Sequence, residues 1–131
     1  MNVSIFDDFD KFNAFRERVA PHFAEDTAAP GTKYLIPSAG HCAVMAILVN
    51  MVFGGDLVSA VVEGASHWYN RINGAYVDLT GDQFGQAPVQ VSTSELYPST
   101  RERQPSELSF ETKLRAKKLA ERAKLDNPVF F

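Results

Sequence analysis

An almost uninterrupted apolar segment constrains the fold more than any other feature of this chain. Residues Ala43–Phe53 read AVMAILVNMVF, with Asn50 as their one polar residue, and Gly54-Gly55 follow them. The length of the segment and its terminal glycines predict a helix, because glycine readily adopts the left-handed conformation found beyond a helix C-terminus. A helix that is apolar on nearly all sides is buried on most of its circumference. We therefore expect a central buried helix, with Ser38 as its N-cap.

The size and charge of the chain exclude several classes of protein. Its 131 residues correspond to one domain, residues 1–131, because domains commonly have about 100–200 residues. The net charge of −3 argues against a nucleic-acid partner, since proteins that bind phosphates carry a basic excess. No apolar stretch reaches the ~18 residues of a membrane span. The acidic start MNVSIFDDFD lacks the positive region of a signal peptide. We expect a soluble, cytoplasmic protein that does not bind a membrane.

Two further helices are predicted, one on each side of the apolar segment. In the first, Ser4 is the expected cap and Pro21 the stop, and apolar residues recur every three or four positions: Ile5, Phe9, Phe12, Phe15 and Val19. A long loop over Glu25–Pro37 should follow. The last helix should begin after Ser106 and end near Lys124, before Asn127-Pro128.

Strands are predicted between the apolar segment and the last helix. β-Branched residues and alternating polarity mark Leu57–Val62, Ser66–Ile72, Ala75–Leu79 and a short strand at Val89–Val91. Asn73-Gly74 separates the second and third strands and is the strongest short hairpin signal. The fold class is therefore α+β, with the apolar helix packed on a small antiparallel sheet and flanked by the other helices.

The two-residue turn of this hairpin defines which side chains face one another. It places Tyr69 opposite Asp78 and His67 opposite Thr80. Because side chains alternate along a strand, His67, Tyr69 and Asp78 share one face of the sheet. His67 and Asp78 become diagonal neighbours with Cα atoms ~7–8 Å apart, close enough for an imidazole N–H to donate to a carboxylate. A slip of one residue would place them on opposite faces.

Cys42 is the single cysteine of the chain, and its position gives it a chemical interpretation. One cysteine cannot form an intramolecular disulfide or a metal site with several thiolates. Taken alone it is more often a small buried hydrophobic residue. At the start of the apolar helix, however, the helix dipole stabilises a thiolate nucleophile. An imidazole from His67, oriented by Asp78, would complete the catalytic group, and the backbone N–H of Cys42 would form part of an oxyanion hole.

Four segments of the chain resemble the bacterial YunG-like family, which is related in pattern to papain-like and transglutaminase-like thiol enzymes. They are PSAGHCAV at residues 37–44, Gly54-Gly55, SHWYNR at residues 66–71 and VDLTGDQF at residues 77–84. The resemblance implies a papain-like fold with Cys42, His67 and Asp78 as a catalytic triad. It also leads us to expect glutamine immediately before the cysteine, where this chain has His41. We take His41, Tyr69 and Gln83 as candidate substrate-binding or oxyanion residues.

These observations favour a cysteine-dependent hydrolase or acyltransferase without a cofactor. Its substrate would be an amide or ester, including protein or peptide substrates. The alternative is a catalytically inactive binding or interaction protein that keeps the fold. In that case Trp68, Tyr69 and Tyr76 would line a ligand cleft. A metal site formed by His41, Cys42, His67 and Asp78 is disfavoured, because adjacent side chains at a helix start point in different directions.

Overall fold

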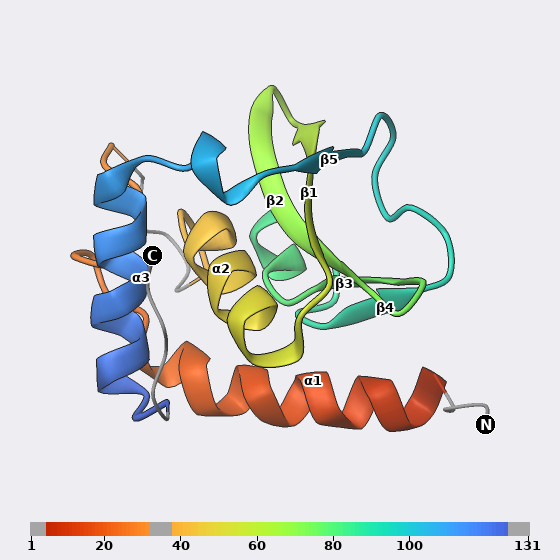
Figure 1. The fold of residues 1–131 in the computed structure, drawn as a ribbon, viewed down its shortest axis with the longest axis horizontal. Coiled ribbons are helices and arrows are strands. Elements are labelled where there is room, and N and C mark those ends of the chain that lie inside the picture. The colour runs from red at the N-terminus through yellow and green to blue at the C-terminus, as the bar shows by residue number, and fades with distance from the viewer. Residues whose placement is uncertain (1–4, 32–37, 126–131) are drawn as a thin grey trace.

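A small antiparallel sheet and three α-helices make up the protein (Figure 1). The computed structural model describes residues 5–31 and 38–125. The helices are α1 (Ile5–Val19), α2 (Cys42–Phe53) and α3 (Phe110–Arg122). The strands are β1 (Asp56–Val62), β2 (Ala65–Ile72), β3 (Ala75–Asp78), β4 (Gln90–Ser92) and β5 (Arg101–Arg103), in the spatial order β4-β3-β2-β1-β5. Short 3-10 helices cover Ala20–His22 (η1), Gly81–Phe84 (η2) and Pro105–Glu107 (η3). The predicted α+β class is confirmed.

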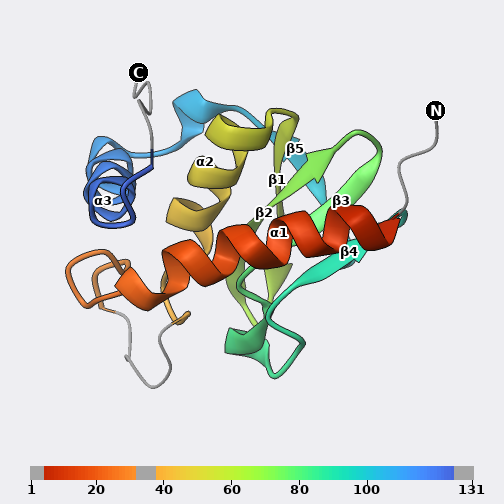
Figure 2. The same ribbon diagram turned by 90° about the horizontal axis from the view of Figure 1, so that it is seen from below.

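The apolar helix α2 is the centre of the core, as its composition predicts. It packs against β2 on one side and α3 on the other, so that it lies between the sheet and α3 (Figure 1). All residues from Val44 to Val49 are buried. Helix α1 passes beneath both α2 and the sheet (Figure 2). There Phe12 and Phe15 contact the ring of Phe53 edge-on, with centroid distances of 4.9 and 5.2 Å.

The start of α2 differs from the prediction, because Ser38 is not its N-cap. His41 occupies the N-cap position without a side-chain capping bond, and Cys42 is the first helical residue. The Ser38 hydroxyl instead accepts a hydrogen bond from Nη2 of Arg16 (3.0 Å). This bond ties the segment before the cysteine to α1. Gly40 has a φ of 76° between these residues, a left-handed conformation that places His41 and Cys42 at the helix entrance.

The glycine pair after α2 ends the helix and also allows a close approach to the sheet. Gly54 and Gly55 both have positive φ angles, of 78° and 81°. A Cβ atom on Gly55 would lie 2.3 Å from the carbonyl oxygen of Arg71, which is far inside van der Waals contact. Glycine is therefore required at position 55 both for its backbone angle and for the space beside β2.

The register predicted for the β2–β3 hairpin is confirmed. Asn70 pairs with Val77, and Ile72 pairs with Ala75. Asn73 and Gly74 have φ angles of 49° and 81°, as a turn with two left-handed residues requires. The two sides of the sheet consequently differ. One side contributes Leu57, Trp68, Ile72 and Val77 to the core around α2, and the other carries a smaller cluster of Val58, Ala60, Tyr69 and Tyr97.

Other predicted boundaries shift by a residue or two, and one helix start was wrong. The short strand expected at Val89–Val91 is β4, and β5 at the other edge of the sheet was not predicted. Ser106 lies within η3, while Ser109 caps α3 by accepting a hydrogen bond from the Thr112 N–H (3.1 Å). Pro105 explains the error, since it starts the separate turn η3. The expected cap Ser4 and residues 32–37 of the expected loop lie outside the described residues.

Candidate functional site

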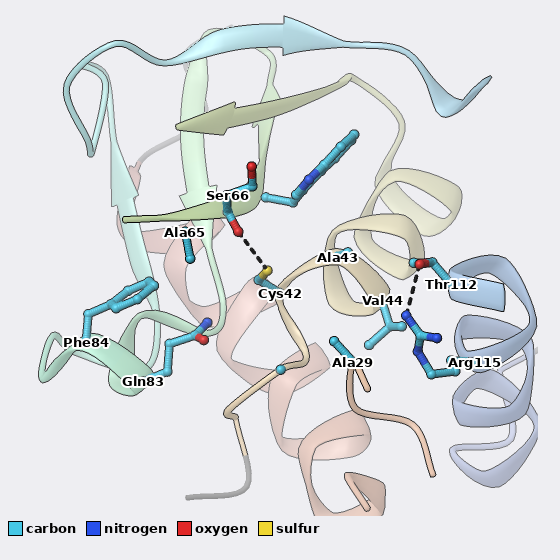
Figure 3. A pocket seen from close by; sticks show the side chains of 12 residues that line it. Ala29, Cys42, Ala43, Val44, Ala65, Ser66, Gln83, Phe84, Thr112 and Arg115 are labelled. Carbon is cyan, nitrogen blue, oxygen red and sulfur yellow. Dashed lines mark hydrogen bonds between the residues drawn. The ribbon is translucent and has the colours of Figure 1, made fainter. Parts of the chain in front are cut away.

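The sulfur of Cys42 lies at the entrance of α2, beside the first residues of β2. The residue is half-buried and lines a pocket, and its thiol points toward the carbonyl oxygen of Ser66, 3.9 Å away (Figure 3). The N–H groups of the first helical turn have no partners within a helix. Any negative charge on the sulfur or on a bound ligand therefore meets the positive end of the α2 dipole.

His67 and Asp78 form the hydrogen bond that the hairpin register predicts. Nε2 of His67 donates to Oδ2 of Asp78 over 2.8 Å, and both side chains are fully buried, with exposed fractions of 0% and 1%. The Cys42 side chain lies close enough to the same imidazole to raise its pKa, while the thiol itself donates its hydrogen bond to the Ser66 carbonyl. The structure therefore brings the three predicted residues together, with His67 between the thiol and the carboxylate.

Asp78 is held by donors on both of its oxygens. Besides the imidazole, Oδ2 accepts a bond from the Tyr97 hydroxyl (2.5 Å). Oδ1 accepts from the backbone N–H of Thr80 (3.0 Å) and from its hydroxyl (3.3 Å). Burial and the neighbouring Asp78 charge raise the pKa of Tyr97, so this phenol remains a donor. Four donors fix the carboxylate in the position from which it orients His67.

The surroundings of His67 favour its charged form. Burial by itself lowers the pKa of an imidazole, because it disfavours the cation. The hydrogen bond of His67 to Asp78 and the nearby Cys42 side chain act in the opposite direction and outweigh burial, raising the pKa of His67 to about 9. An imidazolium beside a thiol is the arrangement in which a thiolate is stabilised.

Three aromatic rings enclose the imidazole of His67. Phe84 and Tyr97 contact it edge-on, with centroid distances of 4.8 and 5.1 Å. Tyr69 stacks against it at 6.1 Å and forms a short hydrogen bond with the Thr100 hydroxyl (2.5 Å). Tyr69 therefore lies behind His67 and supports the ring, and it is not among the residues that line the pocket.

Gln83 reaches the pocket from η2. Its Nε2 donates to the carbonyl of Thr80 (3.1 Å) and lies 3.5 Å from Nδ1 of His67, the ring nitrogen that does not bind Asp78. The neighbouring residue Asp82 accepts a hydrogen bond from Arg16 (3.1 Å). Since Arg16 also binds Ser38, one side chain of α1 connects the segment before Cys42 with the turn that carries Gln83.

His41 has a different environment from the one an oxyanion donor needs. It is fully buried, and its Nε2 lies 2.7 Å from the Thr27 hydroxyl, while Nδ1 lies 3.1 Å from the carbonyl of Ala39. Its ring stacks on Phe23 at 4.2 Å. These contacts hold His41 among the residues that precede α2, and it does not line the pocket. Its position favours a structural role.

The pocket has a volume of about 370 Å³ and extends to both sides of the cysteine. Figure 3 shows Gln83 and Phe84 on one side of Cys42, and Arg115 and Thr112 on the other. Small side chains form much of the wall between them: Ala29, Ala43, Ala65 and Ser66. The site is thus a short groove with the sulfur near its middle, an amide and a phenyl ring at one end and a guanidinium at the other.

Several residues of the site were not predicted from the sequence. Tyr97 and Phe84 come from the segment between β3 and β5, and Thr112 and Arg115 from α3. Phe84 ends the segment VDLTGDQF but was given no role, and the other three lie in no recognisable pattern, because each reaches the site through long-range packing. Of the basic residues of α3, Arg115 is the one that lines the pocket.

Neither a metal-binding cluster nor a membrane-spanning helix is present in the part of the chain that the structure describes. Residues 5–31 and 38–125 contain no group of three or more His, Cys, Asp or Glu side chains arranged to hold a metal ion. Within the same ranges, none of the helices is long and apolar enough to cross a membrane.

The fold and the site define an α+β protein with a pocket cysteine next to a buried histidine–aspartate pair. The chain belongs to the YunG family, whose sequence profile, described as "YunG protein", matches residues 11–124. It is 41% identical over 66 residues to a protein of Bacillus subtilis (strain 168) described as "Uncharacterized protein YunG". That match covers 50% of this chain and 54% of the relative, so the chain spans about half the length of the curated relative. No solved structure matches the chain.

Proposed function

We propose that the protein is a cysteine-dependent hydrolase or acyltransferase that acts on an amide or ester. The observation that carries the proposal is the position of Cys42 beside the hydrogen-bonded pair His67–Asp78, with Cys42 as the one member of the three that lines the pocket. A cysteine that is merely a core residue needs no imidazole, and a buried imidazole needs no carboxylate held by four donors. The same order of groups, with the cysteine at a helix start and the other two residues on adjacent strands, resembles the papain-like and transglutaminase-like thiol enzymes.

In the first step the thiolate of Cys42 attacks the substrate's carbonyl carbon. The new S–C bond forms as the carbonyl π electrons move to oxygen, which becomes an oxyanion. When the carbonyl re-forms, the bond to the leaving nitrogen or oxygen breaks. The leaving group takes the proton from Nδ1 of His67, the ring nitrogen that is not bonded to Asp78. Asp78 stays hydrogen-bonded to Nε2 and stabilises the imidazolium until that proton is transferred.

The second step releases the acyl group. Water, or an amine in the case of acyl transfer, attacks the thioester and returns one proton to Nδ1 of His67. The S–C bond breaks and the thiolate is restored. The backbone N–H of Cys42 and the Nε2 amide of Gln83 are the proposed donors to the oxyanion in both steps, since Gln83 lies beside the same imidazole nitrogen. In this proposal Gln83 takes the role that the residue before the cysteine was expected to have.

Alkylation of Cys42 by iodoacetamide between pH 6 and pH 8 tests whether the sulfur is activated. A free cysteine loses roughly 100-fold in rate over this range as its thiolate is protonated. We expect the wild-type rate to change less than about threefold, because the imidazolium stays charged throughout. His67→Gln should lower the rate at pH 6 at least about tenfold, and His41→Gln should not. A wild-type profile that follows a free cysteine peptide would overturn the proposal.

Acyl transfer to the sulfur tests the chemistry itself. Incubation with p-nitrophenyl acetate should place an acetyl group on Cys42, detected by peptide mass spectrometry, and hydrolysis of the adduct should regenerate the free thiol. Cys42→Ser serves as the negative control, and His67→Gln should slow acylation by about 100-fold. If the thiol is activated but acylation does not depend on His67, the protein is a binding module with a reactive cysteine.

A further inference from the structure

Arg115 places a positive charge in the same pocket as the proposed nucleophile. It lies on α3, and its side chain lines the pocket together with Cys42 (Figure 3). Nη2 donates a hydrogen bond to the Thr112 hydroxyl (2.9 Å), which holds the guanidinium in place. The Nε atom is enclosed by protein and has no hydrogen-bond partner among the described residues. Most of the donor capacity of this guanidinium is therefore unused.

The other half-buried arginines of the described chain are all paired with carboxylates. Arg16 contacts Asp82, Arg71 contacts Asp56 and Glu102, and Arg103 contacts Glu107. For Arg115 the structure of residues 5–31 and 38–125 gives only the Thr112 hydroxyl as a partner. Partly burying a cation without an anion costs free energy. The guanidinium of Arg115 at the pocket wall is therefore suited to bind an anionic group of a ligand.

We propose that Arg115 binds a carboxylate of the substrate, so that the substrate is a small amide or ester with a carboxylate at one end. The inference rests on the proposed function for the position of the reacting carbonyl. With the carboxylate at Arg115, the carbonyl would lie over Cys42 and the rest of the molecule would extend toward Gln83 and Phe84 (Figure 3). A guanidinium suits this role because its planar N–H groups match the two oxygens of a carboxylate.

The volume and composition of the pocket agree with a small charged substrate. A cavity of about 370 Å³ is near the lower end of the range for small-molecule sites. Its walls offer alanine side chains, which contact the substrate without hydrogen bonds, and they place the polar groups at the two ends. Among the described residues that line the pocket, Arg115 carries the one fixed charge. Discrimination between substrates with and without a carboxylate would therefore depend on it.

The test compares an anionic and a neutral alkylating agent of the same shape. Iodoacetate and iodoacetamide are reacted separately with the folded protein at pH 7, and Cys42 alkylation is followed by mass spectrometry. We expect Arg115→Gln to lower the ratio of the iodoacetate rate to the iodoacetamide rate by about fivefold. The matched control is Lys117→Gln, which removes one charge from an exposed position of the same helix and should leave the ratio unchanged. An equal ratio in wild type and Arg115→Gln would overturn the inference.

A second measurement needs no variant and applies even if Arg115→Gln does not fold. Glutarate should slow the alkylation of wild-type Cys42 by iodoacetamide, and the uncharged glutaramide should not. Equal protection by the two compounds, or protection by neither, would overturn the inference. Where Arg115→Lys is folded, glutarate should protect it less than wild type, because an ammonium retains the charge and loses the paired N–H geometry.

These readouts separate the inference from the proposed function. The ratio of two rates cancels the intrinsic reactivity of the sulfur, so it reports on Arg115 whether or not His67 activates the thiol. A ratio that depends on Arg115 with a thiol that behaves like a free cysteine would retain the carboxylate site and reject the catalytic proposal. If the reactivity of the thiol depends on His67 but the ratio of the two rates does not depend on Arg115, the catalytic proposal is retained and the carboxylate site is rejected.

Discussion

The two buried histidines near Cys42 lie in regions with different chemistry. His41 precedes the cysteine and contacts the Thr27 hydroxyl, the Ala39 carbonyl and the ring of Phe23. His67 lies on β2 and contacts a carboxylate and the thiol itself. Both rings have an exposed fraction of 0%. Burial therefore does not distinguish them, and the contact of His67 with the Asp78 carboxylate and the Cys42 thiol does.

This difference shows how the same side chain serves packing in one place and chemistry in another. The hydroxyl and carbonyl around His41 satisfy its ring nitrogens and bring no opposite charge. Asp78 lowers the free energy of the His67 cation, because a carboxylate within hydrogen-bond distance stabilises the charged ring. Only a histidine of the second kind can both stabilise a thiolate and later donate a proton. Variants at the charged partner of His67 should therefore change stability and reactivity more than variants beside His41.

Removing the charge beside His67 should have the largest effect. Asp78→Asn keeps the shape of the side chain. It replaces one carboxylate oxygen, which accepts two hydrogen bonds, with an amide nitrogen that accepts none. We expect the free energy of unfolding at pH 7 to fall by about 3 kcal/mol, since a buried ion pair loses one partner. Chemical denaturation followed by tryptophan fluorescence measures this change. The alkylation rate of Cys42 at pH 6 should fall in the same variant, and a variant that retained both stability and rate would reject the role of Asp78.

Deprotonation of His67 at high pH should lower the free energy of unfolding by a comparable but smaller amount. Because the pKa is raised from 6.5 to about 9 on folding, the protonated ring stabilises the folded protein. This contribution is fully present below pH 6.5 and is lost as the pH rises through about 9, and it amounts to at most about 3 kcal/mol. Imidazole NMR signals of His67 should titrate with a midpoint near pH 9. The difference in unfolding free energy between wild type and His67→Gln should shrink from pH 6 to pH 9.5.

A midpoint for His67 near that of a free imidazole would contradict this account. It would mean that burial, which disfavours the cation, outweighs the hydrogen bond of His67 to Asp78 and the effect of the nearby Cys42 side chain. His41→Gln is the control, because His41 contacts neither Asp78 nor Cys42 through its described hydrogen bonds. The titration of His67 should be unchanged in it.

The charged pair could be predicted from the sequence because its geometry is local. Asn73-Gly74 defines the hairpin register, and the register places His67 and Asp78 on one face. The apolar segment and the glycines after it similarly predicted α2, because a buried helix needs no information from elsewhere in the chain. Sequence patterns were sufficient where the residues of a turn, or the spacing of apolar residues, determine the local structure.

The groups that surround the pair could not be predicted in this way. Tyr97 donates to Asp78 across 19 residues of chain, and that path passes through β4 and an irregular loop. Arg115 reaches the pocket because α3 packs on α2, and the apolar periodicity of α3 does not specify which element its buried face contacts. The cap of α2 was predicted wrongly because a local rule was applied where a distant residue decides the structure. Ser38 is a good local cap, but Arg16 binds its hydroxyl and His41 begins the helix instead.

The smallest effect is expected on the uncharged side of the comparison. Thr27→Val removes the hydroxyl beside Nε2 of His41 while keeping the shape of a buried side chain. This hydroxyl also accepts a hydrogen bond from the Ala24 N–H and donates one to the Ala24 carbonyl, so its loss should lower the free energy of unfolding by about 1–2 kcal/mol. The iodoacetamide rate of Cys42 should stay within about twofold of wild type at both pH 6 and pH 8, because the change reaches neither His67 nor Asp78. A large loss of reactivity in this variant would show that His41 also controls the reactivity of the Cys42 sulfur. The distinction between the two histidines would then be wrong.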